Sequence, residues 1–391
     1  MALHAAVGQA TDLDGREAAS QAAQLALTQM DAARPVAAIV FASHEYEVQA
    51  VQSGLAARLG DTPVFGFSTA GELSSGGRGR RSVVVALVAG DGLAGRVGWA
   101  QGNAENGGRG IEELSAALGL GANSHGALLL AGPGLTLNGD ALGAALPPGD
   151  YALAGALAGG DVRRGHTFQI AGGQAGGNGL AGLYLGGNVT AGVASGHGWR
   201  SVGAYFKITG TRGAWVRMLD GKPASETYAS LFGHSARDWA FPPLNEMVRL
   251  YPLGLEADGV EGLNVRTPLQ VEPDGSLRMN ALVAESTMAH LLVGSTEACL
   301  TAARDAAGRA LKALGGAKPR LAIVLADVGW EMLFRGQPGA EVGALRDVLG
   351  PDVPLAGGYT LGQFARPGGD GLPQFLNQQM VVLVLGEKGE V

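Results

Sequence analysis

The sequence predicts an α/β protein of two domains, built from repeated strand-helix-strand-turn-strand units with mixed sheets. Three features predict it: unbroken apolar runs of strand length, helical periodicity between those runs, and a glycine motif that recurs. The chain has 391 residues, of which 46% are hydrophobic, 16% are charged and 66 are glycine. Because the glycines alternate with Val-, Ile- and Leu-rich runs, we expect a folded chain with many tight turns rather than a disordered one.

The glycine motif occurs twice in the same register. Pro63–Leu73 reads PVFGFSTAGEL and Pro354–Phe364 reads PLAGGYTLGQF, so Pro, Gly, Thr and Gly coincide and a Glu or Gln follows. An apolar run precedes each copy, at Pro35–Ala42 and Pro319–Ala326. Unbroken runs of this length are typical of strands buried on both faces. The chain therefore contains a duplicated unit.

A helix is predicted between the apolar run and the motif in both copies. Apolar residues recur at helical spacing over Val48–Leu59 and over Val342–Leu349, and a glycine follows each series. A further strand is predicted after each motif, at Ser82–Val88 and at Met380–Leu385.

A third copy lies between the other two and is more diverged. Its lead-in is Ala127–Leu130, its glycine turn lies in Tyr151–Asp161, and its closing strand is Leu180–Leu185. The Thr of the other copies is missing from it. Three diverged copies with long insertions favour related subdomains over a regular solenoid.

The remaining stretches complete the expected outline. Residues 15–33 predict a helix with Leu25, Leu27 and Met30 facing inward, and 190–220 predicts strands. A second domain is expected to begin near Phe241–Pro243. Within it we expect strands at 264–266 and 281–283, a turn at 273–275 and a long helix at 296–314.

Charge and composition argue against several classes of partner. The net charge of −7 gives no positive field for nucleic acid or anionic lipid, and we expect the arginines at 78, 80 and 81 to lie in a solvated loop. Cys299 is the only cysteine, so intrachain disulfides are excluded. No apolar run approaches membrane-spanning length. We therefore expect a cytoplasmic protein that binds neither nucleic acid nor membrane.

The glycine turns are also the candidate ligand site. They follow strands at their carboxyl ends, where α/β sheets commonly place ligands. Ser68, Thr69 and Thr360 offer hydroxyl groups, Glu72 can meet an ammonium group, and Arg266 can hold a carboxylate. This set suits a zwitterion. The alternative is that Thr and Gly only satisfy the turns and that Glu72 pairs with an arginine.

Catalytic motifs are weak in this sequence. Gly66–Gly71 reads G-x-S-x-x-G rather than the G-x-S-x-G nucleophile elbow, and no His partner can be assigned to its Ser. Gly90–Gly95 matches G-x-G-x-x-G, but a strand-like segment follows it instead of a helix. We expect a protein that is not an enzyme.

Several of these segments resemble FIST domains. Gly66–Glu72, Gly155–Asp161 and Asp220–Ala224 resemble the FIST N-terminal domain; Arg266–Pro268, Gly357–Gln363 and Asn377–Gln379 are similar to the FIST C-terminal domain. Two positions depart from the pattern: Phe67 replaces a usual cysteine, and Gln363 replaces a usual glutamate. The resemblance implies a FIST N domain over residues 33–225 and a FIST C domain over 226–386.

The resemblance also implies a function. It suggests an intracellular sensor that binds an amino acid or a similar metabolite and signals in trans to a partner such as a histidine kinase or cyclase. It extends the ligand-binding set to Asp161, Tyr359, Gln363 and Asn377, with no cofactor. One alternative is a haem-binding nitric-oxide sensor with His166 or His197 as axial ligand. A second alternative is an interaction adaptor that binds no ligand.

Overall fold

The computed structural model describes residues 3–102, 107–134, 138–161, 165–256, 263–366 and 371–387. It is a mixed α/β structure with 27% helix and 42% strand, which confirms the predicted fold class. The chain divides into two compact units. The three-sheet unit comprises Met1–His197, Leu300–Phe375 and Gln379–Val391, and the inserted unit comprises Gly198–Cys299 and Leu376–Gln378. These units differ from the two consecutive domains expected at 33–225 and 226–386. The third repeat lies late in the sequence but packs in the same unit as the first two.

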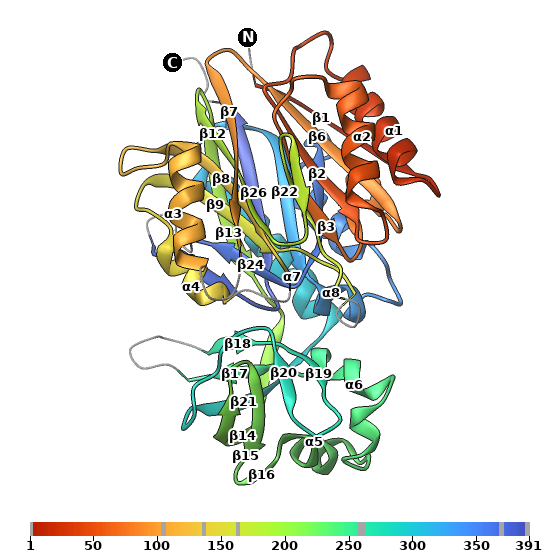
Figure 1. Cartoon of the computed structure of the whole chain (residues 1–391), viewed down its shortest axis with the longest axis vertical. Helices are drawn as coiled ribbons and strands as arrows, with labels where there is room; N and C mark the ends of the chain where they lie inside the picture. Colours follow the sequence, from red (N-terminus) through yellow and green to blue (C-terminus); the bar gives the residue numbers. More distant parts are fainter. Residues whose placement is uncertain are drawn as a thin grey trace. The chain divides into compact units, whose positions relative to one another are not determined.

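Each predicted repeat forms the middle of one sheet in the three-sheet unit (Figure 1). The lead-in strand lies parallel to the strand of the glycine motif and antiparallel to the closing strand of the same repeat. The sheet of the first repeat has the order β1 (His4–Thr11), β6 (Ser82–Ala89), β2 (Ala37–Ser43), β3 (Val64–Thr69), β10 (Gln169–Ala171) and β11 (Gln174–Gly176).

The other two sheets repeat this order among the described residues. All three copies predicted from the sequence are therefore confirmed, including the diverged middle one. The middle sheet runs β7 (Leu93–Gln101), β12 (Gly179–Gly187), β8 (His125–Gly132), β9 (Asp150–Leu157), β24 (Gly362–Ala365) and β25 (Gln374–Leu376). The third runs β13 (Thr190–Gly196), β26 (Met380–Glu387), β22 (Lys318–Asp327), β23 (Leu355–Thr360), β4 (Glu72–Ser74) and β5 (Gly77–Arg78).

The repeats exchange their hairpins in a closed cycle. The hairpin β4–β5 follows β3 in sequence but pairs with β23 of the third repeat. The strand β24 follows β23 but pairs with β9 of the middle repeat, and β10 follows β9 but pairs with β3 of the first. No repeat can complete its own sheet, so the three depend on one another to fold.

Helices cover the outer faces of these sheets. In the first sheet, α1 and α2 lie together beside β1, β6 and β2 (Figure 1), and their side chains share one apolar core with those strands. The helices of this unit are α1 (Gly15–Thr28), α2 (Val48–Leu59), α3 (Gly107–Leu118), α4 (Gly139–Ala145), α7 (Thr296–Ala313, whose first residues belong to the inserted unit), α8 (Val328–Leu333) and α9 (Ala340–Leu349).

The inward face of α1 differs from the prediction. Met30 is buried as expected, but Leu25 is 48% exposed and Leu27 is only half-buried. The buried face consists of alanines, among them Ala18 and Ala22. The reason is the close approach of α1 to β1: a Cβ added to Gly8 would lie within 3.0 Å of the Ala22 carbonyl oxygen. Only small side chains fit between these two elements.

The inserted unit has its own apolar core, formed by residues such as Ile208, Tyr228 and Trp239. The predicted strands at 190–220 and 264–266 and the turn at 273–275 are confirmed, but the strand expected at 281–283 is wrong. Residues 277–279, directly after the turn, form the strand instead, and they pair with residues 268–271 before the turn. The elements are β14 (Trp199–Arg212), β15 (Trp215–Leu219), β16 (Lys222–Pro223), α5 (Ala224–Phe232), α6 (Leu244–Met247), β17 (Leu253–Leu255), β18 (Asn264–Arg266), β19 (Pro268–Val271), β20 (Leu277–Met279) and β21 (Met288–Gly294).

Candidate functional site

The three glycine turns meet in the three-sheet unit and are joined by a ring of backbone hydrogen bonds. In each bond, the residue after the Thr position of one repeat donates to the residue before that position in another repeat. The donors and acceptors are Ala70 N to Tyr359 O (2.9 Å), Leu361 N to Leu157 O (3.0 Å) and Gly159 N to Ser68 O (2.8 Å). The turns that the sequence marks as a candidate site are therefore neighbours in space.

Glu72 is a completely buried carboxylate beside this ring. The Thr69 hydroxyl donates to its Oε1 at 2.7 Å, and the Ser82 amide and hydroxyl donate to its Oε2 at 3.0 and 2.7 Å. Burial raises the pKa of Glu72 from 4.5 to about 7, although these hydrogen bonds act in the opposite direction. The centre of the unit thus holds a group that titrates near neutral pH.

Gln363 occupies the equivalent place in the third repeat. Its Nε2 donates to the Thr360 hydroxyl at 2.9 Å and lies 3.4 Å from Oδ2 of Asp327. The Thr360 hydroxyl donates to the Ala326 carbonyl oxygen at 3.2 Å. The Thr and the Glu or Gln that recur in the motif are therefore hydrogen-bonded to each other in both repeats.

In the middle repeat, the residue at the position equivalent to Glu72 and Gln363 is Gln169 and not Asp161. Gln169 pairs with Phe67 across the exchanged strands, as Glu72 pairs with Gly358. It is fully buried, and its Oε1 accepts from Gly179 N at 3.3 Å. Asp161 is half-buried and forms an isolated bridge eight positions earlier in the chain. The residues between the glycine turn and β10 place Gln169, and not Asp161, at the position equivalent to Glu72. The role of Asp161 as a ligand-binding residue stays a prediction.

The hydroxyl groups of the predicted site satisfy the turns. Ser68 Oγ donates to the Gly159 carbonyl oxygen at 2.8 Å and accepts from Phe168 N at 3.0 Å. Ser68, Thr69, Thr360 and Gln363 have no exposed surface. These contacts agree with the alternative that the polar side chains only stabilise the turns. A direct contact between a ligand and these groups stays a prediction.

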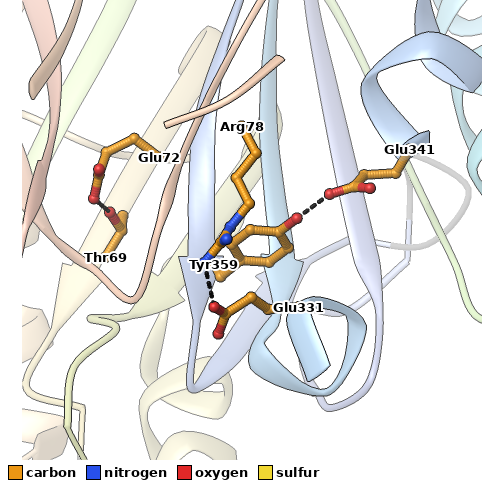
Figure 2. A network of polar contacts seen from close by, with 6 residues as sticks. All are labelled: Thr69, Glu72, Arg78, Glu331, Glu341 and Tyr359. Atoms are coloured by element: carbon orange, nitrogen blue, oxygen red, sulfur yellow. Dashed lines mark hydrogen bonds and ion pairs between the residues drawn. The ribbon is translucent and has the colours of Figure 1, made fainter. Parts of the chain in front are cut away.

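Tyr359 belongs to a second polar cluster, which joins the first and third repeats (Figure 2). Its hydroxyl donates to Oε1 of Glu341, at the start of α9. The guanidinium of Arg78 pairs with Glu331 of α8, and its Cζ lies 5.9 Å from the centre of the Tyr359 ring. We call Arg78, Glu331, Glu341 and Tyr359 the Arg78 centre. Gly71 permits this packing, since a Cβ there would lie 3.2 Å from the Tyr359 ring and 3.3 Å from the guanidinium.

The Arg78 centre has a buried interior and a rim that solvent reaches. Glu341 is completely buried and Tyr359 has no exposed surface, whereas the side chains of Arg78 and Glu331 are 20% and 25% exposed. Burial raises the pKa of Glu341, and burial together with Glu341 raises the pKa of Tyr359 well above 10. Among the described residues, Oε2 of Glu341 and Nε of Arg78 have no hydrogen-bond partner. The centre therefore offers one acceptor and one donor to a further group.

The sequence located only Tyr359 of this centre. It placed Arg78 in a solvated loop, but Arg78 lies in the exchanged hairpin and pairs with a residue 253 positions away. Glu331 and Glu341 have ordinary helical surroundings in the sequence. No local pattern marks them, because the exchange of the hairpin alone brings them to Arg78.

Two predicted residues belong to the inserted unit. Arg266 is 3% exposed, and its guanidinium donates to Asn264 Oδ1 at 2.7 Å and to the Val265 carbonyl oxygen at 3.1 Å. Asn377 is 1% exposed, and its Nδ2 donates to the Leu376 carbonyl oxygen at 2.8 Å. Within the inserted unit, both side chains are held by local contacts.

The two histidines proposed as haem ligands have polar or partnered surroundings. His166 is exposed, and His197 is half-buried with an interaction partner. Neither lines the pockets of about 630 and 380 Å³ that described residues form in the three-sheet unit. Within the described ranges, no cluster of three His, Cys, Asp or Glu residues has the arrangement of a metal site. The haem alternative, with His166 or His197 as axial ligand, stays a prediction.

The fold and its centre define a class of protein: three interlocked α/β repeats with a buried polar core and an inserted unit. The FIST N domain matches residues 36–222 and the FIST C domain matches residues 224–366. These matches cover most of the chain, so the chain belongs to the FIST family. FIST domains are sensory domains of signal transduction. Among the described helices, none combines the length and apolar character needed to cross a membrane.

Comparisons with other proteins give little beyond the family. A cyanuric acid hydrolase from A. caulinodans is similar to the chain at 12% identity and a TM-score of 0.35, covering 99% of this chain and 100% of that one. PurLQS from Thermotoga maritima is similar at 11% identity and a TM-score of 0.24, covering 99% of this chain and 73% of that one. At these TM-scores the likeness carries no argument about fold or activity. No curated protein matches the chain.

Proposed function

We propose that this chain is a cytoplasmic sensor that binds a small zwitterion, an amino acid or a similar metabolite, and signals in trans to a partner such as a histidine kinase or cyclase. It acts by binding and not by catalysis. The observation that supports this proposal is the Arg78 centre. It sets a guanidinium at a solvent-reached rim beside a buried carboxylate with an unpartnered oxygen. These are the groups that a ligand carboxylate and a ligand ammonium require.

The same contacts suggest how binding would change the structure. The ion pair between Arg78 and Glu331 joins the exchanged hairpin of the first repeat to α8 of the third. A ligand carboxylate competes with Glu331 for the guanidinium, and a ligand ammonium binds Glu341. Because the ligand favours the arrangement in which Glu331 is released, binding shifts α8 away from its present position. A partner can read that change on the surface of α8.

Arg78→Gln is expected to weaken amino-acid binding by about 10- to 100-fold, since a hydrogen bond to a charged group contributes about 1.5–3 kcal/mol. The measurement is a thermal-shift screen of the whole chain against the amino acids, followed by calorimetric titration of the best one. Arg320→Gln is the matched control. The ion pair of Arg320 with Glu387 has similar exposure, at 30% and 28%, and lies in the same unit.

Two results would contradict the proposal in different ways. Equal affinity of the wild type and Arg78→Gln would move the zwitterion site away from the Arg78 centre. If no amino acid raises the melting temperature, the chain is not a sensor of amino acids, and the adaptor alternative is favoured.

A further inference from the structure

One face of the sheet in the inserted unit carries a row of arginines around a tryptophan. Arg212 of β14 lies opposite Trp215 of β15, and Trp215 lies opposite Arg278 of β20. Directly opposed residues share a face of the sheet, and so does Arg217, two positions after Trp215. The other face of these strands belongs to the core, where Val216 is completely buried. The arginines and the indole therefore share the solvent face.

The indole of Trp215 is held in place although it is 39% exposed. Its Nε1 lies 3.4 Å from Oε1 of Glu272, to which it donates a hydrogen bond. Cζ of Arg278 lies 5.9 Å from the centre of the indole. A pocket of about 590 Å³ opens beside this ring, a volume within the usual range for small-molecule sites. Its lining consists of Arg212, Trp215, Arg217, Glu272, Pro273, Asp274 and Ser276.

The lining of this pocket carries charges of both signs. It contains two guanidinium groups, from Arg212 and Arg217, and two carboxylates, from Glu272 and Asp274, while a third arginine, Arg278, lies against the indole. Asp274 accepts hydrogen bonds from the amide and hydroxyl of Ser276 at 3.0 and 2.6 Å and lies in the field of Arg217.

Arg212 is the arginine available to a ligand. Within the described part of the chain, its guanidinium has no hydrogen-bond or ion-pair partner, and its side chain is exposed. A guanidinium in this state can bind a carboxylate through two parallel hydrogen bonds without first breaking an ion pair.

We propose that this pocket binds a small aromatic carboxylate, with its ring on Trp215 and its carboxylate on Arg212. A ring stacks on an exposed indole in an offset or edge-on arrangement. A monoanion needs only the guanidinium of Arg212, whereas a nucleotide phosphate with a charge of about −2 would be repelled more strongly by Glu272 and Asp274. The site lies in the inserted unit and is separate from the Arg78 centre, so it is a second ligand site.

The test is a calorimetric titration of the whole chain with 3-phenylpropionate. Propionate lacks the ring and 2-phenylethanol lacks the carboxylate, so each is expected to bind at least about 10-fold more weakly, a loss of about 1.4 kcal/mol. Arg212→Gln and Trp215→Ala are expected to weaken binding of 3-phenylpropionate by about 10-fold or more. Arg237→Gln, at another exposed arginine of the inserted unit, is the control and should bind as the wild type does.

Three results would overturn this inference. The first is unchanged affinity in both Arg212→Gln and Trp215→Ala. The second is tighter binding of adenosine monophosphate than of 3-phenylpropionate, which would make the site a nucleotide site. The third is no binding of 3-phenylpropionate by the wild type at about 10 mM, well above a Kd of about 1 mM. Trp215→Phe keeps an aromatic ring and is expected to retain binding, which separates loss of stacking from loss of folding. The amino-acid titrations of Arg78→Gln are unaffected by any of these results.

Discussion

Gly159→Ala is expected to unfold the protein or to lower its stability by about 4 kcal/mol or more. A Cβ at Gly159 would lie within 3.0 Å of the Tyr359 carbonyl oxygen and the Ala70 amide nitrogen. These two atoms form one hydrogen bond of the ring between the glycine turns. Because both neighbours are backbone atoms of other repeats, neither can move without breaking the contact between repeats. Urea unfolding followed by circular dichroism measures the loss.

The matched control is Gly343→Ala in α9. Gly343 is exposed, and no atom lies within 4 Å of an added Cβ. Alanine favours a helix over glycine by about 0.8–1.0 kcal/mol, so this variant should be at least as stable as the wild type. A Gly159→Ala variant with wild-type stability would show that the three turns do not meet in the ring described above.

The wild type is expected to lose stability as the pH rises, because Glu72 must ionise in a buried position. The Glu72→Gln variant, which has no ionisable group there, is expected not to show this loss. The pKa of Glu72 is about 7 in the folded chain, against an ordinary value of 4.5. The folded state therefore holds the proton more tightly than the unfolded state between these values. Stability is retained below about pH 4.5 and falls by about 3 kcal/mol as the pH rises through about 7. Gln363 shows that an amide fits the equivalent position.

The measurement is the free energy of unfolding of the wild type and of Glu72→Gln at about pH 5 and about pH 8. Between the lower and the higher pH, the free energy of unfolding of the wild type should fall by about 3 kcal/mol relative to that of the variant. Gln363→Glu is the reverse control. It places a carboxylate close to Asp327, which lies 3.4 Å from Nε2 of Gln363, so it should create a steeper loss with pH. An identical pH dependence in the wild type and Glu72→Gln would exclude Glu72 as the titrating group.

Glu72 and Arg78 lie in the same exchanged hairpin, β4–β5. Within it, Leu73 pairs with Arg78, and Gly79 N donates to the Glu72 carbonyl oxygen at 2.7 Å. A ligand that pulls Arg78 away from Glu331 would therefore act on the segment that also carries the titrating carboxylate. The proposed sensor and the pH dependence of stability are expected to be coupled, with ligand affinity changing near pH 7.

The sequence by itself determined the local structure and the family. Strand length, helical spacing and glycine position are properties of short segments, so the repeats around Gly66, Gly155 and Gly357 could be located without any knowledge of their packing. The motif also marked the glycine turns, which the structure joins in the ring of backbone hydrogen bonds.

The tertiary structure alone decided the partners across repeats. The exchange of hairpins determines which side chain faces which turn, and it joins residues as far apart as Arg78 and Glu331, 253 positions away. In the middle repeat, the residue equivalent to Glu72 is Gln169, which the pairing of β10 with β3 shows and the sequence register does not. The burial of side chains also depends on packing between repeats. The Ser68 hydroxyl is buried because the glycine turn of the middle repeat covers it and accepts its hydrogen bond. Such contacts depend on chain segments distant in sequence, and no local pattern encodes them.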